Sequence, residues 1–338
     1  MSGGVDSSIA AALLVKAGWD VFGVTFRMFD ADSSTTAQDA RHVAEILGVE
    51  HQVVDCRERF AREVVEPFVQ EYQAGRTPNP CVRCNPLIKF ELLLELADEH
   101  GAERVATGHY VRVTSRGERL GLRRAHDRGK DQSYVLAGLG QNHLRRALFP
   151  LGEYTKAQVR EMAKDLGLPA ADRDESQEIC FIPDDDYRGF LTQHAGLPAP
   201  GPILSTDGAE LGRHQGLPFY TVGQRKGLGI AAPRPLYVLR LDPEQNAVIV
   251  GHEEETLSGS LTAREVNWCG MAPQDEPFDA LVQIRYRHTA TPATITPTPD
   301  GFTTRFHTPQ RAVTPGQWAV AYDDDMVLLG GVIQDAGQ

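Results

Sequence analysis

The stretch that decides the fold is Ser2-Gly3-Gly4-Val5-Asp6-Ser7-Ser8, followed at once by the Ala-rich run IAAALLVKAG. Two adjacent glycines let the backbone turn tightly and aim amide N–H groups at an anion, and the N-terminus of a helix behind them adds its dipole. The sequence therefore predicts a pyrophosphate cradle here. The alternative is a glycine turn in which Asp6 or Ser7 only caps the helix. No G-x-x-x-x-G-K-[ST] string occurs, which excludes a Walker-type P-loop.

Alternating apolar patterns follow this loop. Strands are predicted at 20–27, 50–55 and 104–107, and helices at 36–47, 57–73 and from about 88 to 100. Such alternation is typical of an α/β domain with a parallel sheet, in which ligand groups gather at the ends of the strands. Further helices are predicted at 156–166 and near 187–194.

The pattern of apolar and polar residues changes after the Pro/Gly-rich stretch LPAPGPI at 197–203. Short alternating segments separated by turn residues are typical of a small β-barrel or sandwich. They lie around 236–241, 247–251, 280–287, 292–296, 302–307, 317–322 and 326–333. We expect an α/β domain at 1–200, a small central domain at 201–260 and a C-terminal β-barrel domain at 261–338.

Composition limits the class of protein. The chain has 338 residues, 41% hydrophobic and 24% charged, which suits two or three globular domains. It has no apolar run of membrane-spanning length and no secretory signal, so we expect a cytoplasmic protein without a membrane partner. A net charge of −12 argues against indiscriminate binding along nucleic acid. Five cysteines in such a chain favour catalytic, redox or metal roles over a disulfide framework.

Two of the cysteine-containing segments are distinctive. Residues 75–90 read GRTPNPCVRCNPLIKF, and residues 176–187 read SQEICFIPDDDY. Together with SGGVDSS and the ATGHY string at 106–110, they closely resemble the tRNA-specific 2-thiouridylases. The loop alone resembles the wider PP-loop family of ATP pyrophosphatases, which also includes amide-forming ligases. The likeness runs from Ser2 to beyond residue 330.

The resemblance implies a reaction and its cofactors. ATP with Mg²⁺ would adenylate the C2 oxygen of the wobble uridine in a tRNA anticodon loop, and sulfur would then displace AMP to give 2-thiouridine. By position, Cys84 matches the family's nucleophile and Cys180 its persulfide carrier. The sulfur would come from a donor such as a cysteine desulfurase or a sulfur-relay protein.

The resemblance also implies binding residues. ATP would be held by Ser2, Gly3, Gly4, Val5, Asp6 and Ser7, with Met28 and Gly108 near adenine and ribose. Packing and a turn are the alternative roles of the last two. The tRNA would contact Asn79, Pro80, Cys81, His109, Lys130, Asp131, Gln132, Arg285, Tyr286 and Gln317. His109 could stack on or hydrogen-bond a flipped base, or only cap a turn. Within the family the loop follows the first strand of the sheet, so we expect that strand to be missing and the true start to lie upstream of Met1.

Two thiols suffice for the sulfur chemistry. One carries the terminal sulfur as a persulfide, and the other attacks the inner sulfur to release hydrosulfide or resolves the adduct as a disulfide. A lowered thiol pKa is expected, with Arg83 or Lys89 supplying the positive charge. Cys56 and Cys269 are expected to pack as small hydrophobes.

Cys81 departs from the commoner family pattern, which has Asp at that position. With Cys84 and Cys180 it could hold a [4Fe-4S] cluster with one open iron. Persulfide chemistry without metal and a structural zinc site are the alternatives, although zinc normally takes four ligands.

A basic segment at 112–130 could contact tRNA phosphates. It holds Arg112, Arg116, Arg119, Arg123, Arg124, Arg128 and Lys130 against Glu118 and Asp127. A solvated hairpin surface is the alternative. Two rival functions also stand beside the thiolase: a PP-loop ligase acting on a small carboxylate, and a non-catalytic tRNA-binding or metal-stabilised module.

Overall fold

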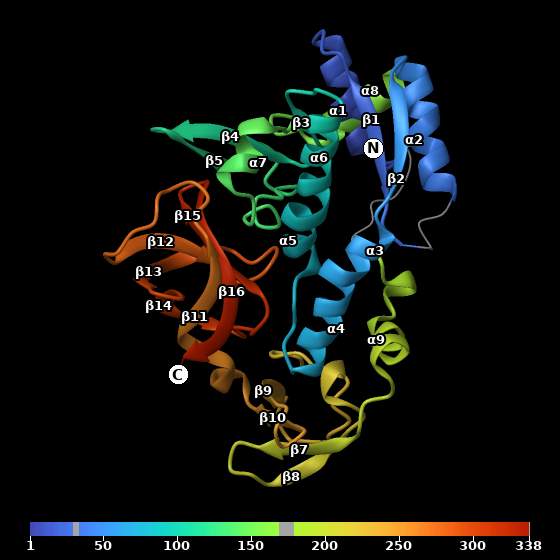
Figure 1. The fold of residues 1–338 in the computed structure, drawn as a ribbon. Helices are drawn as coiled ribbons and strands as arrows, with labels where there is room; N and C mark the ends of the chain where they lie inside the picture. The colour runs from blue at the N-terminus through green and yellow to red at the C-terminus, as the bar shows by residue number, and fades with distance from the viewer. Residues whose placement is uncertain (30–33, 169–178, 338) are drawn as a thin grey trace.

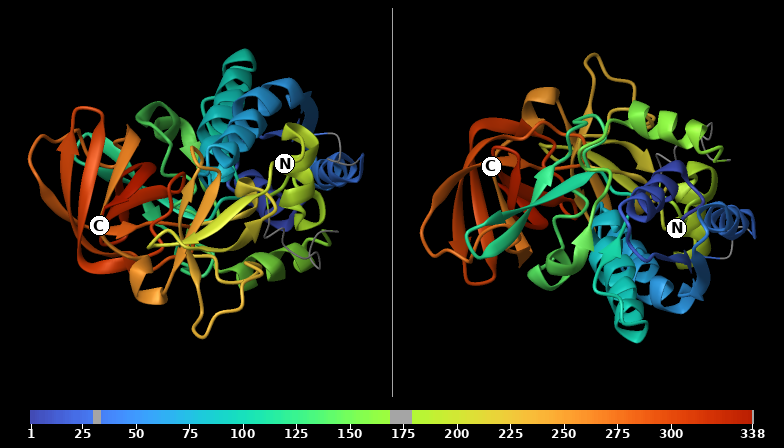
Figure 2. Two further views of the ribbon diagram at one scale, coloured as in Figure 1. Left: turned by 90° about the horizontal axis from the view of Figure 1, so that it is seen from below. Right: turned by 90° about the horizontal axis from the view of Figure 1, so that it is seen from above.

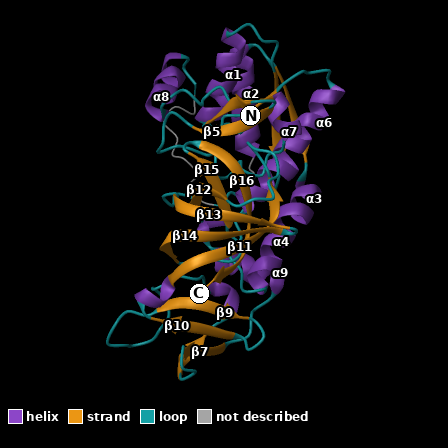
Figure 3. Ribbon diagram, turned by 90° about the vertical axis from the view of Figure 1, so that its left-hand side faces the viewer, coloured by secondary structure: helices purple, strands orange, loops and turns teal. Residues whose placement is uncertain are grey.

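The computed structural model describes residues 1–29, 34–168 and 179–337. Three bodies follow one another along the chain (Figure 1): an N-terminal α/β part, a small sheet at the far end of the molecule, and a β-barrel beside both. Views along the long axis show the barrel and the N-terminal helices on opposite sides (Figure 2). The strands gather in the barrel and the small sheet, and most helices in the N-terminal part (Figure 3).

The N-terminal part holds two short pieces of parallel sheet. β1 (Phe22–Arg27) pairs in parallel with β2 (Glu50–Asp55), and β3 (Val105–Ala106) pairs in parallel with β6 (Ala147–Leu148). The helices of this part include α1 (Val5–Lys16), α2 (Ser34–Leu47) and α8 (Lys156–Asp165). The predicted parallel α/β arrangement is confirmed.

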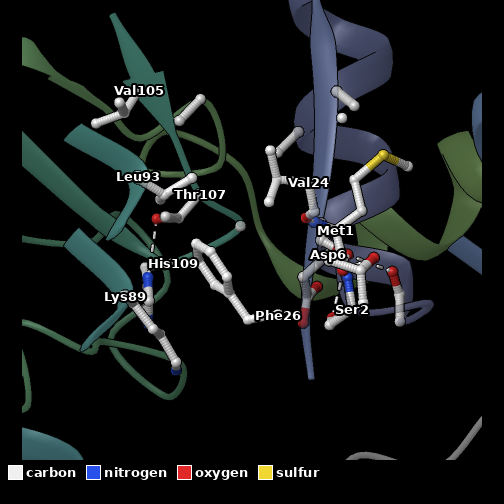
Figure 4. Close-up of a pocket in the computed structure, with 18 of the residues that line it drawn as sticks. Met1, Ser2, Asp6, Val24, Phe26, Lys89, Leu93, Val105, Thr107 and His109 are labelled. Atoms are coloured by element: carbon white, nitrogen blue, oxygen red, sulfur yellow. Dashed lines mark hydrogen bonds between the residues drawn. The ribbon is translucent and has the colours of Figure 1, made fainter. Parts of the chain in front are cut away.

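A cavity separates the two sheet pieces. Among the described residues, β1 pairs only with β2 and β3 only with β6. Val24 and Phe26 of β1 face Val105 of β3 across this cavity (Figure 4). Met1 lies along β1, where Thr25 Oγ1 donates to its carbonyl at 2.6 Å. The Met1 terminal ammonium also donates to the Val24 carbonyl of β1.

Two long helical segments cross the middle of the molecule. The first is continuous from α3 (Arg57–Phe60) through a π-helical turn (Ala61–Val65) into α4 (Glu66–Gln73). The second comprises α5 (Pro80–Cys84), another π-helical stretch (Asn85–Phe90) and α6 (Glu91–Glu99). The helix predicted from about residue 88 thus begins earlier. Pro80 is at its first position, and the Asn79 side chain accepts the Cys81 amide at 3.1 Å.

One hairpin of the N-terminal part appeared in the sequence analysis only as the alternative interpretation of the basic segment. β4 (Val111–Arg116) and β5 (Arg119–Arg124) pair antiparallel, and β5 joins β16 (Met326–Gly337) of the barrel at Arg123 and Met326. The chain then continues through α7 (Gln141–Arg146) and β6 to α8 and α9 (Tyr187–Ala195). The N-terminal part is therefore tied to the barrel through a shared sheet.

The small sheet has four strands in the order β8-β7-β10-β9. It is built from β7 (Gly201–Ser205), β8 (Glu210–His214), β9 (Tyr237–Asp242) and β10 (Ala247–Gly251). The first two were missed by the sequence analysis. The predicted boundary near residue 200 falls between α9 and β7.

The barrel closes on itself, because β11 (Leu257–Asn267) pairs with both β14 (Gly301–Arg311) and β16 (Met326–Gly337). The strand order around it is β11-β14-β13-β12-β15-β16. The other members are β12 (Phe278–Gln283), β13 (Thr291–Thr298) and β15 (Trp318–Asp323). The predicted β-barrel is confirmed, although β11 starts before the boundary expected at 260. Among the residues that the structure describes, none of the helices has the length and apolar character of a transmembrane segment.

Candidate nucleotide and sulfur-transfer site

The opening loop is pre-shaped by its own hydrogen bonds. Gly3 has φ +65, in the left-handed region that favours glycine. Gly4 is the N-cap of α1, and the hydroxyls of Ser7 and Ser8 donate to its carbonyl at 3.1 and 2.9 Å. No side chain caps the helix, so the alternative role of Asp6 or Ser7 as a simple cap is wrong. The loop presents amides and a helix N-terminus to the cavity, as an anion site requires.

Asp6 is held by two partners from distant parts of the chain. The ammonium of Lys156, at the start of α8, donates to its two carboxylate oxygens at 2.7 and 2.8 Å. The hydroxyl of Tyr110 donates to Asp6 Oδ1 at 2.7 Å. The sequence analysis named Lys156 only as the start of a helix. No signal in the sequence could have found it, because Lys156 reaches Asp6 only through the packing of α8 against α1.

Gly108 packs against the loop backbone. A Cβ at this position would lie 2.6 Å from the carbonyl carbon of Asp6 and 2.7 Å from the amide nitrogen of Ser7. No side chain can be accommodated there without moving the loop. Gly108 thus has a steric reason of its own for being glycine.

A cavity of about 1800 Å³ connects the loop with the cysteine segment. It includes the space between β1 and β3, which is why it exceeds an ordinary ligand pocket. Figure 4 shows Ser2 and Asp6 on one wall and Lys89 and His109 on the other. The predicted residues that line it are Ser2, Gly4, Val5, Asp6, Ser7, Met28, Asn79, Pro80, Cys81, Gly108, His109, Lys130, Gln132, Cys180 and Tyr286. The cavity therefore brings together most of the residues predicted for ATP, sulfur and tRNA.

His109 is oriented by its neighbours. Its Nδ1 lies 2.8 Å from Thr107 Oγ1 (Figure 4). Its ring stacks on that of Phe90, with 6.4 Å between the ring centroids. Burial, with a smaller contribution from the Lys89 ammonium, lowers its pKa to about 3. His109 is thus neutral at physiological pH and points a ring edge at the cavity.

The cysteines fall into two groups. Cys56 and Cys269 are buried among apolar side chains, which confirms their predicted packing role. Cys84 is buried in the same apolar cluster as Phe181 and Ile182, the residues that follow Cys180. Cys81 and Cys180 are exposed at the cavity wall. Ser176, Gln177 and Glu178 of the second motif lie outside the described residues.

The expected low thiol pKa is wrong for Cys84 in this conformation. Burial raises the pKa of Cys84 to about 11, and the Lys89 ammonium only partly opposes it. Desolvation by the surrounding protein also raises the pKa of the Cys81 thiol, and the Lys89 ammonium opposes it only in part. Arg83 is not the activating charge, because its Nε donates to the Glu63 carbonyl at 2.7 Å and its side chain lies on the surface.

Lys89 is the cation among the thiols. Burial acts to lower its pKa, but the electrostatic interactions with the neighbouring Cys84, Cys81 and Cys180 together outweigh burial and raise it. It lines the cavity on the same wall as His109 (Figure 4). Even so, no three His, Cys, Asp or Glu side chains of the described part of the chain gather closely enough to hold a metal ion. The arrangement of the cysteines seen here does not fit a cluster.

Three of the predicted tRNA residues lie outside this cavity. Asp131 accepts from Arg124, from the Ala125 amide and from the Ser133 hydroxyl. Arg285 donates to the Arg311 carbonyl at 3.2 Å, and Gln317 donates to the Thr77 carbonyl at 2.8 Å. Asp131 and Gln317 thus make hydrogen bonds within the protein, and Gln317 links the barrel to the TPNP segment at 77–80.

The basic segment is mostly neutralised by partners elsewhere. Arg112, Arg123 and Arg128 all contact the carboxylate of Asp325, which is only 7% exposed. Arg116 pairs with Asp323, and Arg124 pairs with Asp131. The charge surplus that composition suggests is therefore much smaller at the surface, and the sequence analysis missed the ion pairs of Asp325.

Comparisons with known proteins place the chain in a family. Family models match residues 1–184 (tRNA methyl transferase HUP domain), 188–252 (tRNA methyl transferase PRC-barrel domain) and 258–333 (aminomethyltransferase beta-barrel domain). The tRNA-specific 2-thiouridylase MnmA of Pelotomaculum thermopropionicum is 48% identical over 100% of this chain and 96% of its own length. That of Chloroflexus aurantiacus is 48% identical over 98% and 96%. With relatives of this name matched over nearly the whole of both chains, this chain belongs to the tRNA-specific 2-thiouridylase family.

Proposed function

We propose that this chain is an ATP-dependent tRNA-uridine 2-sulfurtransferase. It adenylates the C2 oxygen of the wobble uridine and replaces that oxygen with sulfur. The observation that carries the proposal is the single cavity lined by the anion loop, by Asn79 to Cys81 and by Cys180. Adenylation and sulfur delivery act on the same carbon, so both sets of groups must reach one base.

The first half of the reaction uses the loop wall. The C2 oxygen attacks the α-phosphorus of ATP, pyrophosphate leaves, and C2 then carries AMP as its leaving group. Loop amides and the α1 N-terminus stabilise the charge on the phosphates, and Asp6 is the carboxylate available to Mg²⁺. Met28 and Gly108 line the cavity where adenosine would lie.

The second half uses the cysteines. A persulfide on Cys180 carries the terminal sulfur, which attacks C2 while AMP leaves with the oxygen. The Cys84 thiolate then attacks the inner sulfur, forming a Cys84–Cys180 disulfide and leaving sulfur on the base. The alternative order releases hydrosulfide first and gives the same products. Either way a thiol or dithiol reductant must restore the two cysteines.

The target base must leave its stack before C2 can be reached. Neutral His109 offers a ring edge and a stacking face at the cavity, beside Asn79 and Pro80. Lys130, Gln132 and Tyr286 line the same opening and could contact the anticodon loop. We infer a cytoplasmic reaction, with the persulfide supplied by a cysteine desulfurase or a sulfur-relay protein.

Metal-free persulfide chemistry is favoured over a three-cysteine cluster. Cys84 is buried in the apolar cluster, whereas Cys81 and Cys180 are exposed at the cavity wall. A two-thiol route needs only Cys84 and Cys180 to approach each other. Cys81 would then serve at the wall of the base pocket rather than as a cluster ligand.

The test combines metal content with single-turnover thiolation. Anaerobically purified protein is analysed for iron and acid-labile sulfide, and then given MgATP, a persulfide donor and a tRNA with a wobble uridine. We expect 2-thiouridine to form without iron, to be lost in Cys180→Ala and Cys84→Ala, and to survive in Cys81→Ala. Iron and sulfide that fall together with the yield in Cys81→Ala would establish the cluster instead.

The same assay separates the rival functions. AMP release that ignores tRNA would point to a small-carboxylate ligase. Unchanged tRNA binding in an Asp6→Asn protein, with no AMP formed by the unaltered chain, would point to a binding module. For the thiolase we expect AMP release, tRNA modification and sulfur consumption in equal amounts.

A further inference from the structure

The opening loop has no cation of its own. Between Ser2 and Ser8 the only ionisable side chain is the carboxylate of Asp6. The amides and the helix N-terminus supply partial positive charge only. The triphosphate of ATP carries more negative charge than one Mg²⁺ neutralises. A phosphate site at this loop therefore needs a positive side chain from another part of the chain.

Lys156 is the cation that already touches the loop. It lines the cavity, is only 7% exposed, and donates to both oxygens of Asp6. Its ammonium lies 5.8 Å from the centre of the Tyr110 ring. Lys89 also lines the cavity, but its charge faces the cysteines. Lys156 is thus the side chain placed to neutralise a phosphate at the loop.

Rigid elements hold Lys156 in place. It is the first residue of α8, where Thr155 and Gln158 form a capping box. Its backbone amide donates to Asp127 Oδ2 at 3.0 Å. Val159 of α8 packs in one buried cluster with Val5 and Ile9 of α1. The ammonium is therefore presented to the loop by the helix that packs against the loop's own helix.

We propose that Lys156 is a phosphate ligand of the ATP site and that Asp6 holds its charge only while ATP is absent. When MgATP binds, Asp6 turns to the metal ion and the ammonium turns to a phosphate oxygen. The exchange avoids a buried unpaired charge in either state, which would be strongly destabilising. The proposal rests on the proposed function only for the use of ATP.

The first test measures MgATP binding by calorimetry. Lys156→Gln should weaken binding on the order of ten- to a hundredfold, the range expected for losing a hydrogen bond between charged groups. Lys156→Arg should retain part of the affinity. Lys164→Gln, the same change at an exposed position of the same helix, should bind as the unaltered protein does. Unaltered affinity in Lys156→Gln would overturn the proposal.

A second test separates phosphate contact from mere neutralisation of Asp6. Binding of inorganic pyrophosphate without Mg²⁺ should be tighter in Asp6→Asn, because the ammonium is released from its carboxylate. The gain should vanish in the double variant Asp6→Asn, Lys156→Gln, in which neutral amides replace both charges. Equal pyrophosphate affinity in the single and double variants would show that Lys156 does not touch phosphate.

These outcomes are independent of sulfur transfer. If the unaltered protein forms 2-thiouridine while Lys156→Gln binds MgATP normally, the proposed function stands and the inference about Lys156 is wrong. If Lys156→Gln loses MgATP affinity but no 2-thiouridine forms under any condition, the inference stands and the sulfurtransferase proposal is wrong.

Discussion

Replacing Gly108 by alanine is the most direct test of how the loop is held. The added Cβ would lie 2.6 Å from Asp6 C, 2.7 Å from Ser7 N and 2.8 Å from Asp6 O. All three are backbone atoms, so no side chain can rotate away to make room. Either the loop or the segment carrying residue 108 must move.

The size of the effect follows from overpacking, which typically costs about 1–3 kcal/mol. If the loop moves, that free energy is lost from ATP binding, a decrease in affinity on the order of five- to a hundredfold. If the loop resists, the same free energy is lost from folding, and thermal unfolding occurs at a lower temperature. MgATP titration and a thermal melt of the same sample distinguish these outcomes.

Gly259→Ala is the matched control, because nothing lies within 4 Å of a Cβ built there. It should change neither quantity. A Gly108→Ala protein with unaltered ATP affinity and unaltered melting temperature would refute the close packing of Gly108 on the loop. It would also leave a backbone contact to ATP as the remaining role of this residue.

Three further predictions follow from charge and burial. The pKa of His109 is about 3 in the folded protein against an ordinary value of 6.5, so between these pH values the unfolded chain binds a proton that the folded protein does not. The free energy of unfolding should therefore decrease as the pH falls from about 6.5 to 3. Urea unfolding of His109→Gln should show a smaller decrease over this range, and an equal decrease would contradict the burial of His109. Asp325→Ala removes the carboxylate that three partly exposed arginines share and should lower the free energy of unfolding by about 1–3 kcal/mol. Asp323→Ala, which removes an exposed ion pair, should lower it by less than about 1 kcal/mol. Lys89→Gln should slow alkylation of Cys84 by iodoacetamide near neutral pH, because this ammonium opposes the effect of burial, while Arg83→Gln should leave the rate unchanged; equal slowing in both would contradict the assignment of the charge to Lys89.

The sequence was sufficient to predict those features that depend on residues close together in the chain. The loop Ser2 to Ser8 shapes itself through hydrogen bonds within a few residues, and its pattern predicted an anion site. The alternation of apolar residues predicted every barrel strand except β11, because each strand buries one face. The start of α5 at Pro80 was not predicted, although Asn79 and Pro80 are ordinary helix-start residues.

Partners far apart in sequence could not be predicted. Asp6 and Lys156 are 150 positions apart, and their ion pair depends on how α8 packs against α1. The basic segment was overestimated for the same reason. Its arginines look unopposed within 112–130, but Asp325 reaches them from the turn before β16. Composition gives the number of charged residues in a segment but not which of them form ion pairs in the folded protein.

The segment from Asp127 to Gln132 connects the candidate tRNA contacts with the ATP loop. Gln132 Oε1 accepts the Tyr110 amide at 2.9 Å, and the Tyr110 hydroxyl donates to Asp6. At the other end, Asp127 accepts the amide of Lys156, whose ammonium also binds Asp6. Asp6 is therefore connected to each end of this segment through one intervening residue, Tyr110 at Gln132 and Lys156 at Asp127. We therefore expect that a tRNA which displaces residues 127–132 disturbs both partners of Asp6 and with them the geometry of the loop.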